Sequence, residues 1–188
     1  MLSIIIFLLG VVVTLTCSLL TLTPEISWWL TILISFASII GMFGVNGVVA
    51  ITFCKLFPKK WFQKDSKIFN PSKKECKFYE KLGVKKWKDL IIDLGNLNGF
   101  KKNKIENNPE YIKRFILENN MGFAEHFVSA IVSLFAIFIL PIKLWLPMGL
   151  PIAITSFILN ITPVMVLRYN TPRLKTLLKF SERNKKEN

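Results

Sequence analysis

The chain has 188 residues, a formal net charge of +13, a hydrophobic content of 52% and a mean hydropathy of +0.43. This length allows about one domain. A chain this apolar, in which the charged residues are unevenly distributed, is predicted to have membrane spans that alternate with a basic, solvated part. No nucleic-acid-binding motif is present, and a basic loop beside membrane spans is more often lipid-facing, so nucleic acid is not an expected partner.

Four apolar stretches predict four transmembrane helices, at residues 2–21, 27–54, 123–140 and 144–167. About 20 helical residues cross a hydrocarbon core about 30 Å thick. The first stretch fits that length, and we expect it to be retained as a span because no basic segment precedes it and no small-residue cleavage site follows. The second and fourth are longer and are expected to tilt or kink. The third is the weakest, because it crosses fully only if Glu125 and His126 lie at or inside its boundary.

Basic residues are concentrated in two regions outside the spans. Of the 25 Lys and Arg residues, 17 lie between Lys55 and Arg114 and seven lie at or after Arg168. The positive-inside rule places both regions, and both termini, in the cytoplasm. The hairpin turns at 23–25 and 141–143 then face out. We therefore expect a multi-pass protein of the cell membrane whose basic surface contacts anionic headgroups.

The central region has helical signals of its own. Ser72 and Glu75 have the spacing of a capping box, and Gly83 interrupts the helix that they begin. The following segment, 84–94, places four apolar residues on one helical face, which predicts an interfacial helix with this face among the headgroups: Trp87, Leu90, Ile91 and Leu94. A further helix is expected from Asn108 and leads into the third span.

The predicted fold class is therefore all-α. Four transmembrane helices form two hairpins, with a helical cytoplasmic or interfacial insertion between them, and all parts belong to one domain. Its segments are a first hairpin, a cytoplasmic amphipathic region, a second hairpin and a basic tail: 1–54, 55–122, 123–167 and 168–188. Small residues three apart in the second span, Gly41, Gly44 and Gly47, predict close helix packing, and Asn46 among them predicts a hydrogen bond inside the bundle.

The fourth span ends directly in the sequence R-Y-N-T-P-R, residues 168–173. A positive-inside stop explains Arg168 well but explains Asn170 and Arg173 less well. Pro172 disfavours helix at Thr171, so we expect the chain to bend there before the next helix resumes. Arginine binds phosphate and carboxylate groups bidentately, so a membrane anchor and a binding site are both open interpretations.

Few residues can carry chemistry. The chain has one histidine and lacks phosphate-binding glycine loops, zinc-protease motifs, nucleophile elbows and dinucleotide fingerprints, so neither a metal nor a cofactor is expected. Glu125 and His126 are either a boundary of the third span or a base near the membrane surface. If the third and fourth spans are adjacent and antiparallel, this pair lies level with residues 168–173, where a lipid could be joined to a polar group.

Three stretches resemble one family. "VLRYNTPRLKTLLKF", "KIFNPSKKECKFYEKLGVKKWKDLIID" and "FAEHFVSAI" are similar to the carboxy-terminal, central and span-start segments of the glycosyl-4,4'-diaponeurosporenoate acyltransferases of staphyloxanthin biosynthesis. The resemblance covers about residues 55–175. In that family a histidine follows the glutamate by about one helical turn. Here Val128 stands there and the histidine is His126, which favours Glu125 as the catalytic residue.

The resemblance implies an integral membrane enzyme that moves a fatty acyl group to a hydroxyl of a glycolipid, with a glycosylated carotenoid as one candidate acceptor. The donor would be acyl-CoA or acyl carrier protein. The resemblance implies that Glu125 or His126 is the catalytic base. The groups implied to bind the donor phosphate or the oxyanion are Arg168, Asn170 and Arg173. The groups implied to position the donor or the sugar are Trp87, Lys88 and Asp93.

Two other functions stay open at this stage. One is a non-catalytic scaffold or lipid-binding subunit of a biosynthetic complex. The other is a membrane transferase that acts on an isoprenoid or a phospholipid. A pure transporter is disfavoured because the spans carry few polar groups. The sequence does not specify an oligomeric state.

Overall fold

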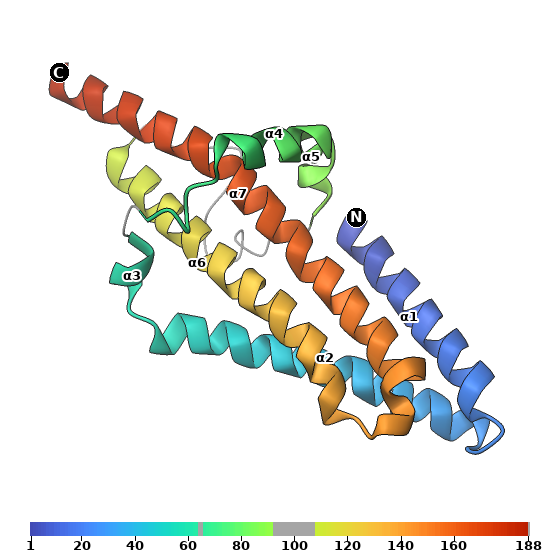
Figure 1. Ribbon diagram of the computed structural model, residues 1–188. Coiled ribbons are helices and arrows are strands. Elements are labelled where there is room, and N and C mark those ends of the chain that lie inside the picture. The colour runs from blue at the N-terminus through green and yellow to red at the C-terminus, as the bar shows by residue number, and fades with distance from the viewer. Residues whose placement is uncertain (64–65, 92–107, 188) are drawn as a thin grey trace. The chain divides into compact units, whose positions relative to one another are not determined.

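The computed structural model describes residues 1–63, 66–91 and 108–187, and every element in these ranges is helical. Four helices among them are long and apolar enough to span a membrane (Figure 1): Leu2–Leu22, Trp28–Phe53, Pro109–Ile139 and Ile142–Lys185. The predicted all-α fold with four membrane-spanning helices is therefore confirmed. The chain is a multi-pass membrane protein by the length and composition of these helices.

The described chain forms two compact units. The first contains Met1–Leu56 and Glu125–Thr162, and the second contains Phe57–Ala124 and Pro163–Asn188. Two long helices, α6 (Pro109–Phe135) and α7 (Leu150–Glu187), contribute to both units. Each unit has its own buried core, so each is described by itself.

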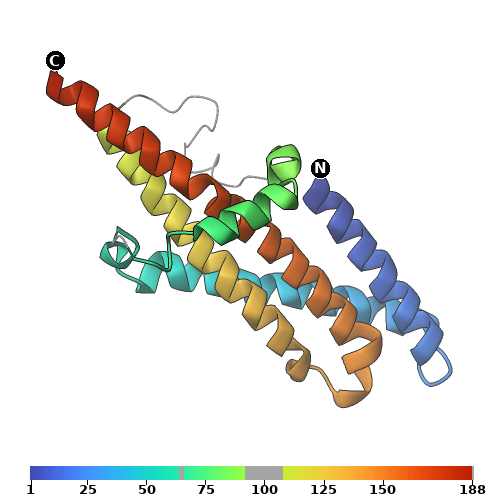
Figure 2. The ribbon, with the colours of Figure 1, turned by 45° about the horizontal axis from the view of Figure 1, so that its top comes forward.

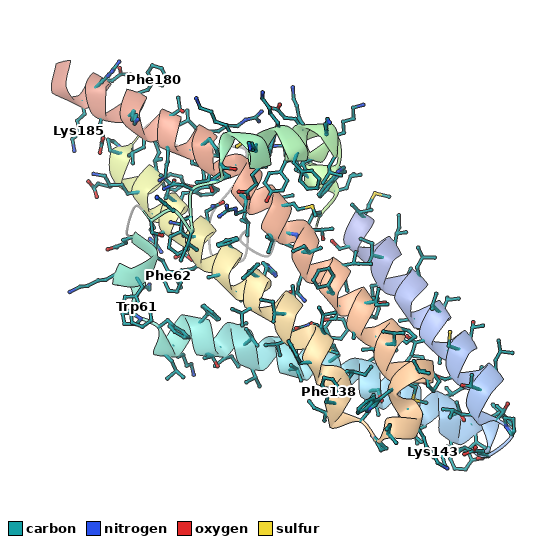
Figure 3. All side chains as sticks on the ribbon, in the orientation of Figure 1. Trp61, Phe62, Phe138, Lys143, Phe180 and Lys185 are labelled. Atoms are coloured by element: carbon teal, nitrogen blue, oxygen red, sulfur yellow. The ribbon has the colours of Figure 1, made fainter. Side chains whose placement is uncertain are left out.

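The first unit contains α1 (Leu2–Leu22), α2 (Trp28–Leu56) and the adjoining parts of α6 and α7. Its core consists of four buried apolar residues: Leu22, Ile39, Met148 and Ile152. The two hairpin turns meet, because the Lys143 ammonium lies 3.5 Å from a carboxylate oxygen of Glu25. Figure 3 shows Lys143 at its turn. This exposed pair adds little stability, but it places both turns at the same end of the unit, as the predicted topology requires.

Close helix packing occurs at a glycine that the sequence did not single out. A Cβ atom on Gly10 of α1 would lie 2.2 Å from Cγ2 of Thr155 in α7, so only glycine fits this contact. In contrast, a Cβ atom on Gly41, Gly44 or Gly47 would meet nothing within 4 Å among the described residues. The predicted close helix packing at these three glycines is therefore not found among the described residues.

Prolines at the start of the fourth span are accommodated by a π-helical turn, Trp145–Gly149, that precedes α7. Pro151 has no N–H, and the carbonyl of Pro147 four residues earlier would lose its partner. The buried Ser18 hydroxyl of α1 donates to that carbonyl at 3.2 Å. The start of the fourth span thus makes a polar contact with α1.

The second unit contains three short helices before α6. These are α3 (Lys59–Gln63), α4 (Lys73–Lys81) and α5 (Val84–Trp87), and α5 continues as a 3-10 turn, Lys88–Leu90. The capping box of Ser72 and Glu75 at α4 is confirmed. Gly83 adopts a positive φ of 65° and reverses the chain between α4 and α5. Figure 2 shows α4 lying across α7, and a buried cluster of Tyr79, Val84, Val166 and Tyr169 joins them.

The predicted interfacial helix over 84–94 is only partly correct. The helical conformation ends at Leu90, and Ile91 is extended. Trp87 and Ile91 pack against the buried cluster of the second unit instead of presenting one continuous apolar face to the headgroups, while Leu90 is 45% exposed. The reversal at Gly83 explains the difference, since it turns α5 back onto the protein. Asp93 and Leu94 lie outside the described residues.

The expected bend at Thr171 and Pro172 is also wrong, because α7 continues without interruption through Pro172. Two side chains support the backbone there. The Thr171 hydroxyl donates to the Leu167 carbonyl at 3.0 Å, and the Asn119 amide of α6 donates to the same carbonyl at 3.3 Å and to the Thr171 hydroxyl at 3.1 Å. The helix thus continues through Pro172, and one of the side chains that bond its backbone just before the proline comes from α6.

The tight contact at Gly10 gives a test of the first unit. Gly10→Ala inserts a methyl group against the stiff, β-branched Thr155, and such overpacking costs about 1–3 kcal/mol. We expect the Tm in detergent to fall by about 3–10 °C. The matched control is Gly44→Ala, which meets open space and should leave the Tm unchanged or slightly higher. Equal melting of both variants would show that α1 and α7 do not meet at Gly10.

Candidate functional site

Arg168 is held by several partners within the second unit. Its Nε and Nη2 atoms donate to the two carboxylate oxygens of Glu75 at 2.5 and 2.6 Å, a bidentate ion pair. Its Nη1 atom donates to the Ile68 carbonyl, and its guanidinium lies 4.9 Å from the ring centroid of Phe123. The two side chains of the pair are only 13% and 25% exposed. Arg168 therefore binds α4 to α7.

Glu75 has two roles in the same region. Its carboxylate closes the capping box of α4 by accepting from the Ser72 N–H at 3.3 Å, and it accepts from the Tyr79 hydroxyl at 2.6 Å. The hydrogen bond from Arg168 is the main cause that lowers the pKa of Glu75, against the opposing effect of burial. Burial and the hydrogen bond to Glu75 raise the pKa of Tyr79 to about 12. Both groups therefore stay fixed in charge over the neutral range.

The remaining residues of the R-Y-N-T-P-R sequence differ in their exposure to solvent. Tyr169 and Thr171 are buried, Asn170 is half-buried and Arg173 is exposed. The Arg173 guanidinium lies 4.7 Å from the Tyr169 ring centroid and donates to the Tyr169 hydroxyl at 2.9 Å. Of the two arginines, Arg173 thus has a guanidinium that is oriented by the protein and still reachable from solvent.

Glu125 and His126 belong to the first unit, in the middle of α6. The Nδ1 atom of His126 lies 3.1 Å from Oδ1 of Asn160 in α7, and Nδ2 of Asn160 donates to the Ser156 carbonyl at 2.9 Å. Glu125 is half-buried, and within the described part of the chain it has no hydrogen bond or ion pair. In this pair, the His126 imidazole is therefore held by a hydrogen bond, whereas the Glu125 carboxylate is not held by one among the described residues.

The other predicted site residues lie in the second unit. Trp87 packs against the buried cluster that contains Tyr169, and its Nε1 donates to the Leu82 carbonyl at 3.1 Å. The central segment and the R-Y-N-T-P-R sequence therefore meet around Tyr169. Lys88 lies 3.8 Å from Asp89. Asp93 falls outside the described residues. The substrate-binding roles of all these residues stay predictions.

Three polar residues of the second unit were not assigned to the site from the sequence. These are Glu75, which the sequence marked only as a helix cap, Tyr79, which donates to Glu75 within α4, and Asn119, whose hydrogen bond reaches from α6 to α7. The i, i+4 spacing of Glu75 and Tyr79 is a local signal for their hydrogen bond. No local signal identifies Arg168 as a partner. Among the described residues, no group of three or more His, Cys, Asp or Glu side chains is arranged to hold a metal.

The sequence model of one protein family, glycosyl-4,4'-diaponeurosporenoate acyltransferase, matches residues 58–180. This range contains every residue predicted for the site, together with Glu75 and Asn160. No curated protein and no solved structure matches the chain.

The ion pair of Arg168 and Glu75 makes stability depend on pH. The pKa of Glu75 is lower in the folded protein than its ordinary value of 4.5. The ion pair therefore contributes fully to the free energy of unfolding above pH 4.5, and this contribution is lost as the pH falls through the folded-state pKa. Glu75→Gln leaves a buried arginine unpaired, so we expect a loss of about 2–4 kcal/mol at neutral pH and a flatter acid dependence. Thermal unfolding between pH 7 and about 3.5 measures both effects.

Glu80→Gln is the control for this experiment, because Glu80 is an exposed carboxylate on the same helix. It should melt as the wild type does over the whole pH range. If Glu75→Gln also melts like the wild type, the ion pair does not stabilise the second unit.

Proposed function

This chain belongs to the glycosyl-4,4'-diaponeurosporenoate acyltransferase family, and on that premise we propose that it transfers a fatty acyl group to a sugar hydroxyl of a membrane glycolipid. The single observation that carries this proposal is the family match over residues 58–180, most of the chain. A glycosylated carotenoid is one candidate acceptor. Four apolar helices suit the proposal, because both the acceptor and the product partition into lipid.

The proposed reaction joins an acyl thioester and an alcohol. A base takes the proton of the acceptor hydroxyl while its oxygen attacks the thioester carbonyl carbon. A carbon–oxygen bond forms, the carbon–sulfur bond breaks, and the base returns the proton to the departing thiolate. The products are the ester and a free thiol. We assign the base to the Glu125 and His126 pair, since these are the proton-accepting side chains at the start of the third apolar stretch.

The donor in this proposal is acyl-CoA or acyl carrier protein. Both are acidic, and both suit a basic protein face. We assign the binding of donor phosphate or the oxyanion first to Arg173, because its side chain is exposed and is oriented by Tyr169. The guanidinium of Arg168 is already paired with Glu75. We therefore assign Arg168 a supporting role, in which it holds α4 against α7. Asn170, Trp87 and Lys88 remain proposed positioning groups for donor or sugar.

We propose that this chemistry occurs at the cytoplasmic face of the cell membrane, with both termini in the cytoplasm. The support is the positive-inside rule applied to the two basic regions. The contact of Glu25 with Lys143 agrees with it, because it joins the two turns that are expected on the opposite side.

A comparison of two variants tests the assignment of the base. In the purified protein, supplied with an acyl thioester and a glycolipid, loss of a general base lowers the rate by about 10²–10⁴-fold. We expect this loss in either Glu125→Gln or His126→Gln and a smaller loss in the other, measured as release of free thiol. Full activity in both variants would refute the assigned base. Lack of turnover in the wild type with every donor would refute acyl transfer and favour a scaffold.

Arg173→Ala tests the proposed anion site. Loss of a charge-assisted hydrogen bond costs about 1.5–3 kcal/mol, so we expect kcat/KM for the donor to fall by about 10–100-fold. Arg183→Ala is the matched control, because Arg183 is exposed on the same helix and lies beyond the R-Y-N-T-P-R sequence. Equal activity of the two variants would exclude Arg173 from the donor site.

A further inference from the structure

The side-chain amide of Asn160 is fixed in one orientation. Asn160 is 7% exposed, and its Nδ2 atom donates to the Ser156 carbonyl at 2.9 Å. A carbonyl oxygen only accepts hydrogen bonds, so the amide nitrogen must be the atom that faces it. The amide oxygen, Oδ1, therefore faces His126 and lies 3.1 Å from the Nδ1 atom of the imidazole.

This orientation determines the tautomer of His126. An amide oxygen is also only an acceptor, so Nδ1 must carry the proton of this hydrogen bond. A neutral imidazole has one ring proton, which leaves the lone pair on Nε2. We propose that Asn160 is a positioning residue that holds His126 as the Nδ1–H tautomer, so that Nε2 is the atom that accepts the proton of the acceptor hydroxyl. The catalytic part of this inference rests on the proposed acyl transfer.

A chain of hydrogen bonds connects side chains of α2, α6 and α7 near Asn160. The Ser133 hydroxyl donates to the Ser129 carbonyl at 2.7 Å, which leaves its oxygen free to accept from the Ser156 hydroxyl, also at 2.7 Å. The Ser156 oxygen in turn accepts from Nδ2 of Asn46 at 3.0 Å. These bonds join α2, α6 and α7 of the first unit. They involve the Ser156 hydroxyl, whereas Asn160 is oriented by the Ser156 backbone carbonyl.

In the proposed step Asn160 acts only through the imidazole. Nε2 takes the hydroxyl proton as the new carbon–oxygen bond forms, and the imidazolium returns that proton to the thiolate as the carbon–sulfur bond breaks. Asn160 keeps its hydrogen bond from Nδ1–H throughout. Carboxylates fill this place in many hydrolytic triads, whereas an amide holds the ring without adding a charge in an apolar setting. The side chains of Glu125 and His126 are about 100° apart around the axis of α6, and Glu125 is not the partner of Nδ1.

The single histidine of the chain permits a direct measurement. Protein labelled with ¹⁵N-histidine, and purified without a histidine tag, gives the nitrogen signals of His126 alone. At a pH where the ring is neutral, we expect a protonated Nδ1 and a bare Nε2. Asn160→Leu removes the acceptor and should shift the ring toward the Nε2–H tautomer that free histidine favours. Asn160→Asp retains an acceptor and should retain the tautomer.

The same variants separate positioning from packing. We expect Asn160→Leu to lower kcat by about 10–100-fold, less than loss of the base itself, with little change in the KM for the donor. Asn46→Leu is the control, because it breaks the chain of hydrogen bonds without touching His126. It should leave the tautomer unchanged.

Two results would overturn the inference. One is a wild-type spectrum dominated by Nε2–H, which decides the matter even if Asn160→Leu does not insert. The other is an Asn160→Leu variant with wild-type tautomer or wild-type kcat. If the wild type shows the Nδ1–H tautomer but transfers no acyl group, the tautomer assignment holds, and the catalytic role of Nε2 is refuted along with the proposed function.

Discussion

The ion pair between Arg168 and Glu75 organises the second unit. It joins residues that are 93 positions apart, one on α7 and one at the amino-terminal turn of α4, and two of the three guanidinium hydrogen bonds among the described residues go to the same carboxylate. Two charges that are largely removed from water are retained only with good geometry and further partners, and both residues have them. The cluster around Tyr169 forms beside this pair and brings the central segment onto the R-Y-N-T-P-R sequence. Arg173 is thereby left as the exposed arginine of that sequence.

A different constraint acts on the first unit, where most of the helical surface is apolar and several polar side chains pair with groups of the protein itself. Several hydroxyls donate to carbonyls four residues earlier, such as that of Thr14 to Gly10 at 2.7 Å. The Ser18 hydroxyl instead reaches the carbonyl that Pro151 leaves free. The hydrogen bond between His126 and Asn160 follows the same rule, since it too pairs polar groups inside the bundle. The histidine is therefore restrained by a polar partner inside the bundle, as several hydroxyls of the unit are.

The sequence predicts the features that local chemistry determines. Four spans follow from the length of the apolar stretches, and the α4 cap follows from the spacing of Ser72 and Glu75. The hydrogen bond of Asn46 was also correctly expected, because a polar side chain in a span needs a partner. The sequence fails where distant segments decide. The helix continues through Pro172, where local preference predicts a bend. Arg168 pairs with a carboxylate on α4, 93 positions away, which no local spacing predicts.

Identification of the product tests the central claim of acyl transfer most directly. The protein is reconstituted in lipid vesicles with an acyl thioester and a glycosylated lipid, and the lipids are analysed by tandem mass spectrometry while free thiol is titrated. We expect an ester on a sugar hydroxyl, formed with one thiol released for each ester. Release of thiol with only free fatty acid as product, or an unchanged donor in the presence of well-folded protein, would contradict acyl transfer to a sugar.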